Sequence, residues 1–117
     1  MPARTKGRAK FDFRGRPFIW WVDADYYLRI ASLDKKFITA YPMGIEWGDP
    51  PVIEVIGSEF PGLDASESRP IWIVAPRLSG ESMGAKVDQL LAWSFNPAHE
   101  LIRSDAPPFI GQFAKQD

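Results

Sequence analysis

Residues 10–41 read KFDFRGRPFIWWVDADYYLRIASLDKKFITAY, and this stretch decides the fold. Charged or polar side chains alternate with apolar ones at 10–14 and 26–32, and a dense aromatic and β-branched run lies between them at 18–22, which is typical of β-strands. A further strand is expected at 36–41, and turn residues separate all four runs. Connections this short join antiparallel neighbours, because a parallel crossover needs about a dozen residues or more. The segment therefore predicts an antiparallel meander.

The run at 18–22 is apolar at every position, which predicts a strand that is covered on both faces and lies near the centre of the sheet. Trp20 and Trp21 are adjacent in this run, so a strand conformation directs their side chains to opposite faces. One of the two therefore faces away from the core, toward a second layer or a partner.

Two more strands are expected, at 52–56 and 71–75, each preceded by an irregular segment that contains proline and glycine. The earlier of these segments covers 42–51. The later one, 58–70, is about 13 residues long, a length at which loops often have a function.

A helix is predicted at 82–95, because Ser82 can cap its first amides and an apolar stripe recurs at helical spacing. Pro97 ends this helix, since it lacks an amide hydrogen and disfavours helical geometry at the residue before it. A short second helix is expected at 98–103, with His99 exposed in its first turn. The tail that follows is extended and is expected to lay Phe109 and Ile110 on the body.

Together these elements predict the α+β class: a single domain over 11–117, with a mostly antiparallel sheet of five or six short strands at about 11–76, packed by one main C-terminal helix. A chain of 117 residues suits one hydrophobic core and is short for two. Residues 1–10 are expected to precede this domain as a basic flexible arm.

Charge is distributed unevenly along the chain. Residues 1–16 carry six basic side chains and one acidic side chain, a balance of +5, whereas the remaining 101 residues carry 8 basic and 14 acidic side chains, a balance of −6. Sheets that read RNA carry basic residues among their aromatics, so nucleic acid is not expected as a partner. No apolar run is long enough to cross a membrane or to serve as the core of a signal peptide, and we therefore expect a cytoplasmic location.

The side chains that carry most catalytic chemistry are scarce. The chain has no cysteine, one histidine, and neither a phosphate-binding glycine motif nor Gly-x-Ser-x-Gly. Asp23 and Asp25 are assigned to a turn, so no metal or other cofactor is expected. An enzyme would need carboxylates as its acid and base, and four lie on or beside the two long loops: Glu46, Asp49, Glu54 and Glu59. We expect a non-enzymatic binding or interaction module instead.

Aromatic residues are abundant, at 14% of the chain. One helix can cover only one face of the sheet, so the other face needs the C-terminal segment 109–113, a second copy or a ligand to cover it. We expect self-association, with a homodimer favoured, through the sheet edge or the aromatic face. The contacts named by this hypothesis are Trp20 or Trp21, together with Trp72.

The alternative is a neutral or cationic apolar small molecule bound in an aromatic pocket. Two loop dipeptides, Glu46-Trp47 and Glu59-Phe60, would rim this pocket, and each places a carboxylate beside an aromatic ring, which suits a cation. The competing interpretation is that Trp47 and Phe60 only anchor their loops to the core.

Overall fold

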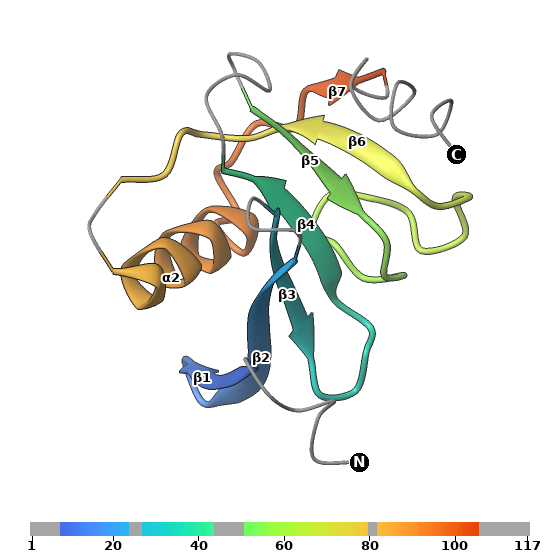
Figure 1. Cartoon of the computed structure of the whole chain (residues 1–117). Coiled ribbons are helices and arrows are strands. Elements are labelled where there is room, and N and C mark those ends of the chain that lie inside the picture. Colours follow the sequence, from blue (N-terminus) through green and yellow to red (C-terminus); the bar gives the residue numbers. More distant parts are fainter. Residues whose placement is uncertain (1–7, 24–26, 44–50, 80–81, 106–117) are drawn as a thin grey trace, which may run out of the picture.

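The structure is a computed structural model that describes residues 8–23, 27–43, 51–79 and 82–105. Within these ranges it has one antiparallel sheet of seven strands, each paired with the next along the chain, and one α-helix (Figure 1). The strands are β1 (Ala9–Phe13), β2 (Arg16–Asp23), β3 (Tyr27–Ser32), β4 (Ile38–Pro42), β5 (Val52–Val55), β6 (Ile71–Val74) and β7 (Arg103–Ser104). The α+β class is confirmed, and the strand count exceeds the five or six predicted.

The hairpin between β1 and β2 is closed by a two-residue turn. Arg14 and Gly15 both have positive φ, 53° and 86°, as a type I′ turn requires, and this turn matches the twist of the paired strands. The Gly15 amide donates to Asp12 Oδ1 at 2.8 Å. Strand β1 begins at Ala9, and residues 1–7 of the expected arm lie outside the described residues.

Strand β2 is not the centre of the sheet, and its apolar run is not covered on both faces. Phe18 is 1% exposed, but Trp20 and Trp21 are partly exposed and Val22 is 40% exposed. The reason is the topology. Because the strands lie in the sheet in the order of the chain, β2 is next to one margin and β4 is at the centre. Within the described residues the one helix packs on one face of this sheet, and the segment 109–113, which was expected to lie on the body, is outside the described residues.

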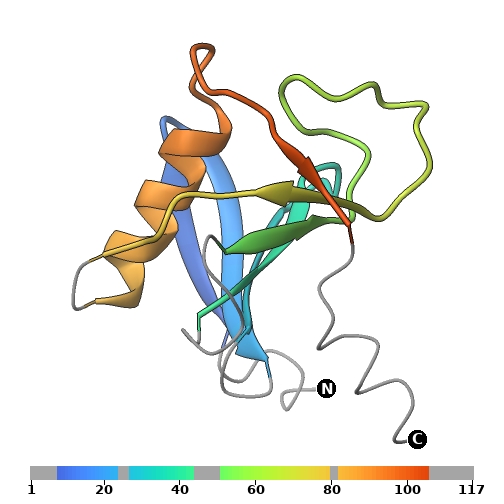
Figure 2. The same ribbon diagram turned by 90° about the horizontal axis from the view of Figure 1, so that it is seen from above.

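Helix α2 (Met83–Ser94) covers the inner face of the sheet. The Ser82 hydroxyl accepts a hydrogen bond from the Ala85 amide, as its position before the helix predicted. The helix buries Val87, Leu90 and Leu91 in the same core as the alternate residues of β1 to β6. Figure 2 shows the twist of the sheet, in which β5 and β6 cross the direction of β1 and β2.

The segment 98–103 does not form the predicted second helix. The chain makes a single turn in which Asn96 accepts from the amides of Ala98 and His99, and it then extends along β6 as the short strand β7. Six residues are few for a stable helix, because nucleation fixes several residues for the first hydrogen bond. Pairing with β6 supplies backbone partners that an isolated turn lacks.

Tyr41 connects the sheet to the segment that leads into α2. Its hydroxyl donates to the Pro76 carbonyl and accepts from the Leu78 amide, both at 3.0 Å. Burial raises the pKa of Tyr41, so the phenol keeps the proton that it donates. The chain between β6 and α2 is therefore held by a satisfied polar group inside the core.

We predict opposite effects from placing alanine at two glycines. A Cβ at Gly57 would lie 2.2 Å from the backbone oxygen of Lys36, whereas nothing lies within 4 Å of one at Gly84 in α2. Gly57→Ala should therefore lower the free energy of unfolding by about 2 kcal/mol or more. Gly84→Ala should raise it by about 0.5 kcal/mol, because alanine loses less backbone entropy in a helix. Urea denaturation of both variants checks this, and equal effects would contradict the close approach at Gly57.

Candidate functional site

A cleft opens on the side of the sheet that carries α2, between the start of β2, the turn at 33–36 and the loop at 58–63. Its volume is about 810 Å³, and we call it the clamp cleft. Its lining combines two cations, two carboxylates, one serine and apolar residues from the loop and from the end of α2: Arg16, Lys36, Asp34, Glu59, Ser58, Phe60, Pro61, Gly62, Leu63, Ala65 and Phe95.

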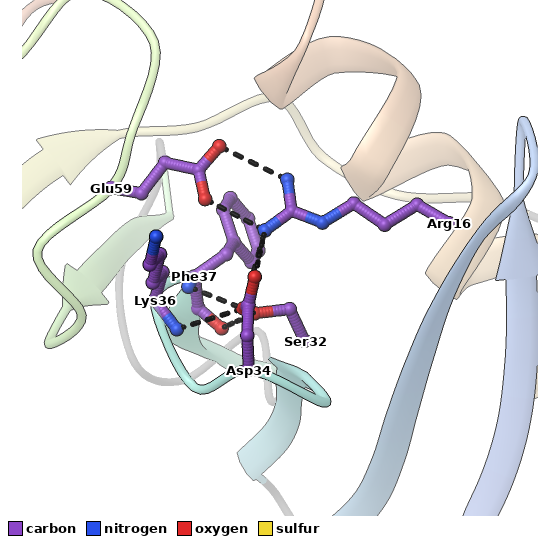
Figure 3. A network of polar contacts seen from close by, with 6 residues as sticks. All are labelled: Arg16, Ser32, Asp34, Lys36, Phe37 and Glu59. Carbon is purple, nitrogen blue, oxygen red and sulfur yellow. Dashed lines mark hydrogen bonds and ion pairs between the residues drawn. The ribbon is translucent and has the colours of Figure 1, made fainter.

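Arg16 lines the clamp cleft, and its guanidinium points toward Glu59 and Asp34 (Figure 3). Its two terminal nitrogens donate to both Glu59 carboxylate oxygens, at 3.0 and 2.7 Å, and one of them also reaches Asp34 at 3.4 Å. The guanidinium carbon lies 5.3 Å from the ring centroid of Phe18 and 5.8 Å from that of Phe95. The hydrogen bonds to Glu59 are the largest cause of a raised Arg16 pKa. This bidentate ion pair connects β2 to the loop after β5.

Asp34 belongs to a second set of hydrogen bonds in the same cleft (Figure 3). One of its oxygens accepts from the Ser32 hydroxyl at 2.5 Å and from the Lys36 amide at 3.1 Å, while the Phe37 amide donates to Ser32 Oγ at 3.0 Å. The Ser32 bond, followed by that from Lys36, lowers the pKa of Asp34. The carboxyl is therefore ionised at neutral pH, which suits a fixed anion and not a general acid.

Phe60 lines the same cleft and is only 3% exposed. It stacks on Phe37, with ring centroids 5.7 Å apart, and on His99 at 6.1 Å. His99 is not an exposed residue of a helix: its Nδ1 lies 2.8 Å from the Trp93 carbonyl oxygen and its Nε2 lies 3.2 Å from that of Pro61. These contacts hold the loop after β5 against the end of α2.

The opposite side of the sheet has a different chemistry, and we call it the outer face. It consists of the alternate strand residues that point away from the core. Its partly exposed apolar members are Ile19, Trp21, Tyr27, Ile38, Val52, Trp72 and Val74. Trp20 packs against the core on the inner face, whereas Trp21 lies on the outer face with the Arg8 guanidinium 4.1 Å from its ring centroid.

The strand register aligns five side chains in one row across the outer face. Successive strand pairings place Trp21 beside Arg29, Arg29 beside Ala40, Ala40 beside Glu54, and Glu54 beside Trp72. Arg29 also donates to Asp23 at 2.8 Å. The Trp72 indole nitrogen is buried and has no hydrogen-bond partner in the described part of the chain. The row therefore reads aromatic, cation, small residue, anion, aromatic.

The structure separates the residues that the sequence grouped as one site. Glu59 and Phe60 lie in the clamp cleft, Trp21, Trp72 and Glu54 lie on the outer face, and Glu46, Trp47 and Asp49 lie outside the described residues. Glu54 and Glu59 occupy opposite sides of the sheet, so they do not form an acid–base pair. Sequence reasoning missed Arg16 and Asp34 as cleft residues, because no local pattern relates Arg16 to a partner 43 positions away.

Comparison with protein-family models, with curated proteins and with solved structures finds no match to this chain. Among the described residues, no group of three or more His, Cys, Asp or Glu side chains is arranged to hold a metal ion. No helix in the same ranges has both the length and the apolar character that crossing a bilayer requires. Function must therefore be inferred from the clamp cleft and the outer face.

We predict that acid destabilises the protein partly through Asp34. Its pKa is lowered in the folded chain, so its contribution to stability is complete above the ordinary value of about 3.9 and is lost as the pH falls through the lowered value. Asp64 and Glu67 are shifted in the same direction. Asp34→Asn should therefore reduce, without abolishing, the fall in urea midpoint between pH 5 and pH 2.5. The same fall in the wild type and the variant would contradict this role.

Proposed function

We propose that the protein is a non-enzymatic interaction module that self-associates through the outer face of its sheet. The observation that carries this proposal is the row from Trp21 to Trp72, which directs two indoles away from the core. Tryptophan and arginine are enriched among the residues that dominate binding energy at interfaces, and the row contains both. The cytoplasmic location expected from the sequence is kept in this proposal.

The row is complementary to itself. Ala40, its middle member, is 1% exposed, with Arg29 on one side and Glu54 on the other. A two-fold axis parallel to β4 and above Ala40 would place Arg29 opposite the Glu54 of a second copy, and Trp21 opposite its Trp72. Charges of opposite sign that meet in this way favour one orientation of the two chains over others. A homodimer is therefore the assembly that the outer face supports best.

A second candidate function is binding of a small molecule in the clamp cleft, favoured by a volume of about 810 Å³. Ligand pockets commonly measure about 300–1,000 Å³. The two cations of the cleft are balanced by two carboxylates, and the body of the chain is acidic, so neutral or cationic apolar compounds fit better than anions. We expect such compounds to quench tryptophan fluorescence saturably, because Trp93 lies 6.1 Å from Phe60. Quenching by anions alone, or by no class of compound, would contradict this candidate.

We predict that the two adjacent tryptophans respond differently to alanine. Trp21→Ala should weaken self-association at least tenfold, equivalent to about 1.4 kcal/mol, and should change stability little. Trp20→Ala should instead lower the unfolding free energy by about 2 kcal/mol, because it removes a partly exposed ring that packs against the core. Sedimentation equilibrium measures the first effect and urea denaturation the second.

Each tryptophan variant is the control for the other, since both remove the same side chain from the same strand. The proposal fails if the Trp21→Ala variant associates as the wild type does, or if the wild type stays at 13.2 kDa at every concentration. A loss of association only in Trp20→Ala would assign the effect to unfolding.

A further inference from the structure

Among the described residues, strand β1 is the margin of the sheet and its backbone is paired on one side only. It is the first strand in the sheet order, with β2 as its one strand neighbour, and in Figure 1 it lies at the rim of the sheet below α2. An edge of this kind presents amide and carbonyl groups to any strand that can approach it.

Pro17 identifies the groups that point outward. It pairs with Asp12, and because proline has no amide hydrogen, this must be a pair without backbone hydrogen bonds. The hydrogen-bonded pairs are then the alternate ones, Phe11 with Phe18 and Phe13 with Arg16. Antiparallel strands alternate in this way, so the amides and carbonyls of Lys10 and Asp12 point away from β2. No hydrogen bond joins these groups to another element in the described ranges.

We propose that β1 pairs with the β1 of a second copy, antiparallel and centred on Phe11, so that the sheet continues from one chain into the other. In this register Lys10 lies opposite the Asp12 of the second copy, and Asp12 lies opposite its Lys10. The outward amides and carbonyls of these residues then form four backbone hydrogen bonds across the interface. Two features select this register: the opposite charges of Lys10 and Asp12, and the outward direction of their backbone amides and carbonyls.

The side chains of β1 suit this pairing on both faces. Lys10 and Asp12 are exposed, and they form two cross-strand pairs of opposite charge around the two-fold axis. Phe11, between them, is partly exposed on the inner face and meets the Phe11 of the second copy. A shift by two residues would place Lys10 opposite the Lys10 of the second copy, or Asp12 opposite its Asp12, so the central register is preferred.

This interface is distinct from the outer face and goes beyond the proposed function. A five-residue strand buries little surface, which places the contact among weak and transient interfaces. We therefore expect weak association, with a dissociation constant of up to about 1 mM. A substitution that disrupts one interface should leave the other intact, because the two interfaces use different residues.

The test uses charge reversal in the full chain. Lys10→Asp and Asp12→Lys each place like charges opposite one another in a homodimer, so each variant alone should associate at least about tenfold more weakly than the wild type. An equimolar mixture of the two should form heterodimers with the affinity of the wild type. The double variant Lys10→Asp/Asp12→Lys should also regain that affinity. Sedimentation equilibrium measures all four samples.

Matched controls separate pairing from net charge. Lys86→Asp and Asp88→Lys, two positions apart on α2, make the same charge changes away from the edge and should show no partner preference when mixed. Because Asp12 also accepts from the Gly15 amide, the melting temperature of each variant is measured to confirm folding. Single variants that associate as the wild type does, or a mixture no tighter than its components, would overturn the proposal while leaving the outer face untouched.

A cysteine scan tests the register, since the chain contains no cysteine of its own. In the proposed pairing the two Cα atoms at position 11 are about 4.5 Å apart, within the range that a disulfide spans. Phe11→Cys should therefore form a disulfide-linked dimer on mild oxidation. Arg14→Cys should not, because its two copies lie about 20 Å apart along the strands. Equal crosslinking at both positions would overturn the register.

Discussion

The ring of Phe37 is the contact on which the other parts of the structure depend. It is completely buried, and ring centroids of Phe18, Phe60 and Phe95 lie 5.8, 5.7 and 5.1 Å from it. These neighbours come from β2, the loop after β5 and the end of α2, so one side chain joins the meander, the loop and the helix. Aromatic pairs at such distances add favourable edge and stacking interactions to simple burial. The Arg16 ion pair closes over this cluster and keeps the loop in place.

A single helix divides the sheet into two faces with different roles. The inner face and α2 share one hydrophobic core, while the outer face carries two tryptophans, an arginine and a glutamate with no described layer over them. This asymmetry supports the proposal that the outer face is the recognition surface, while the inner face forms the core with α2.

The features that were predicted correctly from the sequence are those that depend on short-range geometry. The opposite faces of Trp20 and Trp21 follow from the period of two in any strand, and the start of α2 follows from the capping chemistry of Ser82. The segment 98–103 was assigned wrongly, because six residues carry too little periodicity to distinguish a helical turn from an edge strand. The clamp cleft and the row on the outer face depend on register across several strands. No local pattern contains that information.

The order of the strands has a consequence for how the chain reaches its native state. Every strand pairs with its neighbour in sequence, so most contacts of the sheet join residues that are close along the chain. Closing such short loops costs little entropy, and folds rich in local contacts fold quickly. The four-strand meander can form one hairpin at a time, before β5, β6 and α2 are available. During synthesis, this half of the domain would emerge first and provide the surface on which the later elements assemble.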